Sequence, residues 1–149
     1  MSQRYLIVAS RFNDLISKAL LGGATEVFSE AGIAASHLDT LWVPGCFELA
    51  TVAAQAARSN TYTAIVCLGA VIRGDTPHFD YVCAQTASGL QQVAVATGTP
   101  VIFGVLTTDT IEQALSRSGI KGGNKGKDAA HAALSMAKTM QQLKELTKR

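Results

Sequence analysis

The chain has 149 residues, of which 48% are hydrophobic and 16% are charged, and this composition fits one globular domain with a sizeable core. A formal net charge of +2 is too small to indicate a nucleic-acid-binding protein, and no apolar segment approaches the ~20 residues of a membrane span. Three cysteines without framework spacing and an N-terminus without signal-peptide features predict free thiols in the cytoplasm. We expect a single domain over residues 1–149 that binds neither nucleic acid nor membrane.

Short apolar segments alternate with helix-like segments along the whole chain. The predicted strands are Tyr5–Ser10, Leu38–Val43, Ala64–Ala70 and Val101–Leu106. The first predicted helix has Asn13 or Asp14 as its N-cap and ends at Gly32, and later helices cover residues 48–58, 78–97, 111–118 and 127–146. Because the strands are almost continuously apolar and are separated by helices, we expect a four-stranded parallel sheet covered on both faces. The predicted fold class is α/β, a three-layer α/β/α sandwich of the flavodoxin type.

The segment 69–80 is the most informative part of the sequence. It connects a predicted strand to a predicted helix and places Arg, Asp, Thr and His within positions 73–78. Thr76 is a good N-cap and Pro77 fits the first helical position. This arrangement directs backbone N–H groups at the space above the loop, which favours a phosphate or carboxylate beside His78.

The loops that follow the four predicted strands should meet at one edge of the sheet. In a parallel sheet all carboxyl ends lie at the same edge, and ligands bind in the crevice outside them. The loops in question are Arg11–Asn13, Pro44–Glu48, Gly69–His78 and Thr107–Thr110. Three of the four carry reactive or recognition groups, so the sequence predicts a functional site at this edge.

Six colinear segments carry a strong family resemblance over nearly the whole chain. They are Arg11–Asn13, Val43–Glu48, Leu68–Val82, Pro100–Thr107, Glu112–Ala114 with Arg117, and Gly123–Gly126. Together these segments resemble the 6,7-dimethyl-8-ribityllumazine synthase family, whose members catalyse the penultimate step of riboflavin biosynthesis. Two departures from the family pattern are visible, because Cys46 stands where alanine is common and Ala50 where many members have proline. Both are small residues, so neither departure argues against the family, and we expect Cys46 to alter the shape of the implied pyrimidine pocket.

The resemblance implies a transferase reaction that needs no redox or metal cofactor. The two substrates are 5-amino-6-(D-ribitylamino)uracil and 3,4-dihydroxy-2-butanone 4-phosphate, and the product is 6,7-dimethyl-8-ribityllumazine. An amine of the pyrimidine attacks the ketone to form an imine, phosphate leaves, and ring closure gives the lumazine. The resemblance also implies a homo-oligomer built from pentamers with sites between subunits. It leaves open a pentamer, a decamer or a 60-subunit shell, and riboflavin synthase is a candidate partner.

The resemblance assigns the expected site residues one by one. The pyrimidine and its ribityl chain are assigned to Phe12, Cys46, Phe47, Glu48, Ala70, Val71, Ile72 and Phe103. The phosphorylated substrate is assigned to Asp75, Thr76, Arg117 and Lys125. His78 is the expected catalytic proton carrier, since its reference pKa lies near neutrality. An aspartate would repel phosphate, so binding at position 75 is expected from backbone N–H groups, and Phe103 and Arg117 are expected from the adjacent subunit.

Simpler interpretations of the same residues stay open at this point. Phe12 suits a hydrophobic staple, Glu48 a helix N-terminus, Phe103 the core and Arg117 an exposed helix position. A lone histidine is more often structural, and the three histidines lack the spacing of metal ligands. Two other classes of function also remain, a non-catalytic flavin or lumazine binder and a structural shell protein. Both are disfavoured because the site motifs are intact.

Overall fold

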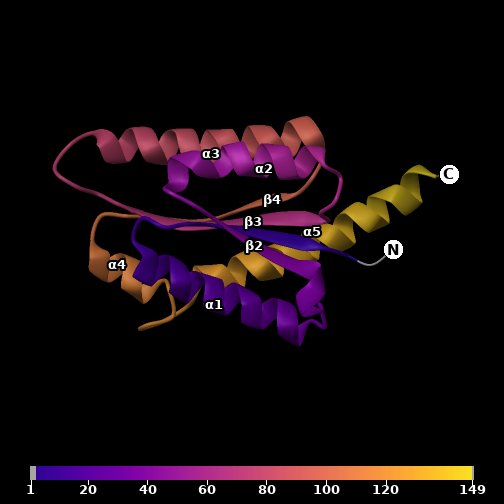
Figure 1. Ribbon diagram of the computed structural model, residues 1–149, viewed down its shortest axis with the longest axis horizontal. Coiled ribbons are helices and arrows are strands. Elements are labelled where there is room, and N and C mark those ends of the chain that lie inside the picture. The colour runs from indigo at the N-terminus through magenta and orange to yellow at the C-terminus, as the bar shows by residue number, and fades with distance from the viewer. Residues whose placement is uncertain (1–2, 149) are drawn as a thin grey trace.

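Strands and helices alternate along the chain in the computed structural model, which describes residues 3–148 (Figure 1). The strands are β1 (Tyr5–Ser10), β2 (Leu38–Val43), β3 (Ala64–Ile72) and β4 (Val101–Thr108). The α-helices are α1 (Asp14–Glu30), α2 (Leu49–Arg58), α3 (His78–Thr97), α4 (Ile111–Ser116) and α5 (Lys125–Thr147). Two short 3₁₀ helices, η1 (Ala35–His37) and η2 (Cys46–Glu48), flank β2. Every predicted strand and helix is therefore present.

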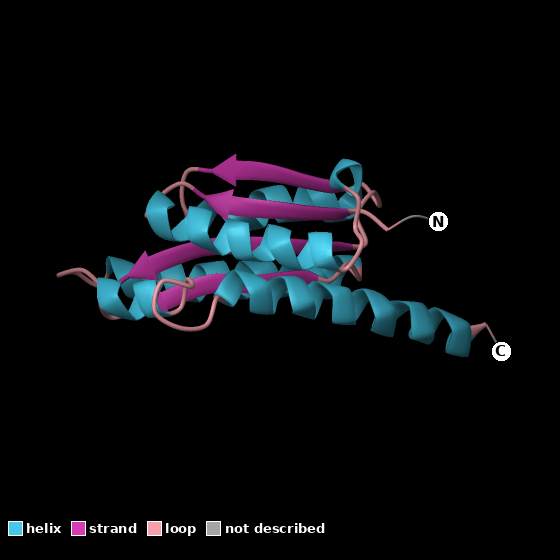
Figure 2. Ribbon diagram, turned by 90° about the horizontal axis from the view of Figure 1, so that it is seen from below, coloured by secondary structure: helices cyan, strands magenta, loops and turns pink. Residues whose placement is uncertain are grey.

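The four strands form one parallel sheet in the order β2-β1-β3-β4. All four arrows point the same way in Figure 2. Helices α2 and α3 cover one face, and α1, α4 and α5 lie on the other (Figure 1). The predicted three-layer α/β/α sandwich of the flavodoxin type is confirmed. The end of α5 extends beyond the body of the sandwich in Figure 2.

Strand β1 is at the centre of both halves of the core. Its side chains alternate between the two faces, so Tyr5 and Ile7 pack with α1 and α5, whereas Leu6 and Val8 pack with α2 and α3. All four side chains are buried. Burial on both faces explains why the segment is continuously apolar instead of alternating.

Several elements end at different residues from those predicted, because tertiary contacts decide their ends. Strand β3 continues to Ile72, where it pairs with Thr108 of the equally extended β4. Helix α5 begins at Lys125, since the Asn124 side chain accepts hydrogen bonds from the backbone of Gly126 and Lys127. Helix α4 ends at Ser116, before a bridge that joins residues 118 and 124.

The beginning of α1 differs from the predicted cap. Asn13 occupies the N-cap position, but its backbone has a φ of 63° and its side chain makes no capping hydrogen bond. The amide nitrogen instead donates to the carbonyl oxygen of Ala70 at 3.1 Å. Asparagine tolerates this left-handed conformation better than most residues. The side chain therefore connects the loop after β1 to the end of β3.

Gly126 allows α5 to cross α1 at close range, which gives a stability prediction. A Cβ at this position would overlap the backbone carbonyl of Leu20, and a backbone group cannot move aside as a flexible side chain can. We expect Gly126→Ala to lower the free energy of unfolding by about 1–3 kcal/mol, measured by urea denaturation. Gly22→Ala in α1 is the matched control. A Cβ there would meet nothing within 4 Å, so we expect a gain of about 0.5–1 kcal/mol from helix propensity. Equal effects of the two substitutions would contradict this account of Gly126.

Candidate active site

A cavity of about 620 Å³ opens at the carboxyl edge of the sheet. The loops after β1, β2 and β3 and the first turns of α3 surround it, as the parallel sheet predicts. Its lining residues are Phe12, Pro44, Gly45, Cys46, Phe47, Glu48, Ala70, Val71, Ile72, Gly74, Thr76, His78, Phe79, Tyr81 and Val82. The cavity thus brings together most of the residues expected to bind the pyrimidine, together with Thr76 and the expected catalytic histidine.

Three aromatic side chains with large exposed surfaces stand at this cavity, those of Phe12, Phe47 and Tyr81, and Tyr81 is 69% exposed. Phe12 is 72% exposed and Phe47 is 58% exposed. The backbone N–H of Phe12 donates to the carbonyl of Pro44 at 3.0 Å, so the loops after β1 and β2 are held together. An exposed ring beside a cavity is suited to stacking on a planar heterocycle. The exposure of Phe12 also disfavours the alternative that it only staples the first helix.

The inner wall of the cavity contains a buried thiol. Cys46 lies beside Ser10, with 3.5 Å between the sulfur and the hydroxyl oxygen. A Cβ on Gly69 would overlap the Ser10 hydroxyl and come within 2.6 Å of the Cys46 sulfur, so only glycine fits between them. Burial raises the pKa of the Cys46 thiol, and the Ser10 hydroxyl lowers it to a smaller extent. The thiol is therefore neutral near pH 7.

The N-cap of α3 lies one residue later than predicted. Pro77, not Thr76, is the residue at the N-cap of α3. The Thr76 hydroxyl accepts a long hydrogen bond of 3.4 Å from the backbone N–H of His78. His78 begins α3 with its side chain exposed at the cavity, whereas Asp75 is exposed in the loop and is not among the lining residues. The carbonyl of Pro77 already accepts a hydrogen bond from the backbone N–H of Asp80 at 3.0 Å, which fits its place at the N-cap.

A second cavity, of about 440 Å³, lies beside the end of β4 and the start of α5. It is lined by Phe103, Val105, Leu106, Thr107, Thr108, Ser116, Arg117, Gly123, Lys125 and Asp128. Phe103 is 38% exposed, so its ring is not a core side chain. One guanidinium nitrogen of Arg117 donates to the carbonyl oxygen of Gln113 at 3.0 Å.

The predicted site residues therefore divide into two groups within one chain. Phe103, Arg117 and Lys125 line the second cavity, and His78 and the expected pyrimidine residues line the first. Within residues 3–148 the two cavities have no lining residue in common. Asp128, which stands one helical turn after Lys125 on α5, also lines this cavity and was not predicted from the sequence. The spacing of three residues was the available signal.

Metal and membrane features can be assessed over the same part of the chain. Within residues 3–148, no three histidine, cysteine or carboxylate side chains gather closely enough to hold a metal ion. None of the helices in this range is both long enough and apolar enough to cross a membrane.

Comparison with known proteins adds to this geometry. Residues 2–141 match the family model described as 6,7-dimethyl-8-ribityllumazine synthase. The chain belongs to the 6,7-dimethyl-8-ribityllumazine synthase family. A protein of that name from Desulfatibacillum aliphaticivorans is 50% identical over 142 residues, which cover 95% of this chain and 92% of that protein. Another, from Protochlamydia amoebophila (strain UWE25), is 50% identical over 137 residues, or 92% of this chain and 80% of that protein. The predicted family, with its transferase activity in riboflavin biosynthesis, is confirmed.

The buried thiol of Cys46 gives a prediction for chemical modification. Only the thiolate reacts with iodoacetamide, and burial raises the pKa of Cys46 above the ordinary value of 9.0. In the folded protein we expect the rate of Cys46 alkylation to increase about tenfold per pH unit and to keep rising above pH 9. The measurement is peptide mass spectrometry after timed alkylation, with the urea-unfolded chain as control. A rate that levels off below pH 9 would contradict the assigned direction of the shift.

Proposed function

We propose that this protein joins 5-amino-6-(D-ribitylamino)uracil to 3,4-dihydroxy-2-butanone 4-phosphate, giving 6,7-dimethyl-8-ribityllumazine, phosphate and two molecules of water. The observation that carries the proposal is the match to the lumazine synthase family over residues 2–141. The two cavities at the carboxyl edge support it, since they contain aromatic rings, the Glu48 carboxylate and cationic side chains.

The first cavity is proposed to bind the pyrimidine. The ring stacks on Phe12, and the strand end Ala70–Ile72 follows its edge with backbone donors and acceptors. Glu48 extends its carboxylate along Gly45, where a Cβ would come within 3.3 Å of the oxygen. We assign to that carboxylate hydrogen bonds with the ribityl hydroxyls, assisted by the backbone around Phe47. These contacts orient the attacking amine toward the loop that contains His78.

The phosphorylated ketone is proposed to lie between the loop that precedes α3 and a second set of cations. Thr76 offers its hydroxyl, and backbone N–H groups near Asp75 and at the start of α3 favour an anion. Arg117 presents a planar fork that matches two phosphate oxygens, and Lys125 adds a point charge. His78 takes the proton released when the amine attacks the ketone carbon and returns it to the departing hydroxyl. Holding the two substrates together supplies a large part of the rate enhancement.

The catalytic roles can be tested by mixing the purified full-length protein with both substrates and following lumazine absorbance against the uncatalysed background. We expect clear acceleration by the wild type. His78→Ala should lower kcat by about 10²–10⁴, the range for loss of a positioned proton carrier. Arg117→Ala should mainly raise KM for the phosphorylated ketone. Circular dichroism provides the folding control. Tight lumazine binding without turnover would instead favour the non-catalytic binder, and unchanged kinetics in both variants would overturn the assigned roles.

We also propose that the complete site forms between subunits of a pentamer-based homo-oligomer. The second cavity, with Phe103, Arg117 and Lys125, is separate from the cavity of His78 within one chain. A neighbouring subunit that places its second cavity against the first cavity of this chain would unite the two groups. Exposed apolar side chains such as Leu143 and Leu146 on α5 support burial of further surface in an assembly.

Shared sites can be tested by subunit complementation. His78→Ala and Arg117→Ala subunits are unfolded, mixed in equal amounts and refolded together. In a ring assembled at random, about one quarter of the interfaces combine an intact His78 with an intact Arg117 from the next subunit. At ketone concentrations well below the raised KM of Arg117→Ala, we expect activity to recover toward that fraction of wild type, whereas each variant refolded alone keeps only its residual activity. No recovery in confirmed mixed oligomers would place both residues of each site in a single chain.

A further inference from the structure

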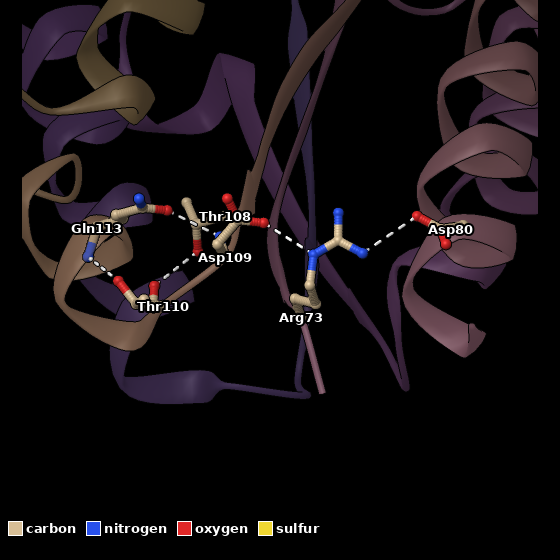
Figure 3. A network of polar contacts seen from close by, with 6 residues as sticks. All are labelled: Arg73, Asp80, Thr108, Asp109, Thr110 and Gln113. Carbon is tan, nitrogen blue, oxygen red and sulfur yellow. Dashed lines mark hydrogen bonds and ion pairs between the residues drawn. The ribbon is translucent and has the colours of Figure 1, made fainter. Parts of the chain in front are cut away.

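Arg73 stands at the junction between β3 and the loop that leads to His78. Its backbone N–H donates to the carbonyl of Thr108 at 2.8 Å, which continues the pairing of β3 with β4. Its side chain contacts Asp109, Asp80 and the ring of Phe79, and Figure 3 shows the two carboxylate contacts. The Nε donates to Asp109 at 2.8 Å, one Nη approaches Asp80 at 3.5 Å, and the guanidinium lies 4.3 Å from the centroid of the Phe79 ring.

These contacts connect both ends of the loop that carries the expected catalytic group. Asp80 and Phe79 lie in the first turn of α3, directly after His78, whereas Arg73 itself lies at the end of β3. One planar group therefore spans the segment from strand to helix. A lysine ammonium is a point charge on a flexible stem, so it cannot form this forked contact and also lie flat on the ring.

The network continues from Arg73 toward the second cavity. The backbone N–H of Asp109 donates to the side-chain oxygen of Gln113 at 2.8 Å. Gln113 lies in α4, where its own N–H donates to Thr110 at 3.1 Å and its carbonyl accepts from Arg117 at 3.0 Å. Figure 3 shows the chain of contacts from Asp80 through Arg73 and Asp109 to Gln113. The loop of His78 and the helix that precedes Arg117 thus have a continuous polar connection.

We propose that Arg73 is a positioning residue that holds the loop of His78 and, through Asp109, sets its distance from the start of α4. The inference rests on the roles proposed above for His78 and Arg117. Arg73 and Asp109 have side chains that are 46% and 65% exposed. Exposed pairs of this kind contribute little to stability. We therefore expect loss of the contact to displace the loop of His78 and to lower activity, with little effect on the free energy of unfolding.

The opposite edge of the sheet offers a matched control. Arg4 forms an ion pair with Asp39 at 2.7 Å, lies 5.7 Å from the centroid of the Tyr62 ring, and has a side chain that is 38% exposed. The composition of this cluster, an arginine, an aspartate and an aromatic ring, is that of the Arg73 cluster. It lies at the amino ends of the strands, where no lining residue of either cavity is found among residues 3–148. Arg4→Lys therefore shows how much kcat and the KM values change when such a cluster is altered outside both cavities.

The experiment compares Arg73→Lys, Asp109→Asn, the double variant and Arg4→Lys in steady-state kinetics of lumazine formation with varied concentrations of each substrate. We expect Arg73→Lys and Asp109→Asn each to lower kcat about tenfold, within the range that a small misplacement of a reacting group produces. KM for the phosphorylated ketone should rise, while KM for the pyrimidine stays constant, because Ala70–Ile72 belong to the sheet. The double variant should be no worse than Arg73→Lys alone, since Asp109→Asn weakens a contact that Arg73→Lys already alters. Arg4→Lys should leave all three parameters unchanged.

Wild-type-like kinetics in Arg73→Lys would overturn the positioning role. A loss of kcat that parallels a lower melting temperature and changes both KM values equally would also overturn it. Losses of kcat in the two single variants that multiply in the double variant would overturn it as well. Failure of the proposed function is a separate result, because the wild type would then form no lumazine above background. If His78→Ala and Arg117→Ala reduce activity but Arg73→Lys behaves like Arg4→Lys, only the inference about Arg73 fails.

Discussion

Parallel pairing of β1 with β2 and β3, and of β3 with β4, is the constraint on which the rest of the structure depends. Ser10 pairs at the level of Val43, and Ile72 pairs at the level of Thr108. The loops that follow these residues therefore begin at the same edge. In a parallel sheet each crossover returns the chain from the carboxyl edge to the amino edge before the next strand begins. The loops that follow the four strands, although distant in sequence, therefore all start at the carboxyl edge.

The sheet can maintain this alignment because helices approach both of its faces closely. Gly104 in β4 leaves room for Leu68 and for Ala129 of α5, as a Cβ would come within 2.6 Å and 3.0 Å of their side chains. Gly69 does the same on the other side, between Ser10 and Cys46. Close-packed interiors transmit small displacements instead of absorbing them. The geometry at the carboxyl edge is accordingly set by the core beneath it as well as by the loops themselves.

The sequence predicted the existence of every strand and helix but not where several of them end. The apolar runs are long enough to identify β3 and β4. The last residues of these two strands pair with each other, however, and no local sequence pattern predicts that pairing. The start of α5 depends on Asn124, and this side chain also donates to the carbonyls of Ala19 and Ser118, so a tertiary contact fixes a local cap. Thr76 was a reasonable N-cap by composition, but Pro77 occupies that position.

Sequence reasoning located most of the candidate site for the same reason that it found the fold. Residues after strand ends must meet, so the grouping of Phe12, Glu48 and His78 at one cavity could be expected from topology. The separation of Phe103 and Arg117 from that group within one chain was expected only through the family resemblance. The spacing of these residues along the chain does not reveal the separation, because the separation depends on which side of β4 each side chain reaches. Asp128 was missed, although its spacing of three residues from Lys125 places both side chains on one face of α5.

The separation of the two cavities also restricts how subunits can assemble if they share a site. An isologous two-fold contact places the same patch of each subunit against itself, so the cavity of His78 could meet the cavity of Arg117 only if both lay in that one patch. A head-to-tail contact instead places the second cavity of one subunit against the first cavity of the next. A head-to-tail contact repeats from subunit to subunit until the rotation between subunits closes a ring. Only in a closed ring does every first cavity meet a second cavity of a neighbouring subunit. The geometry of one chain thus favours a cyclic assembly, whereas the number five follows from the family resemblance alone.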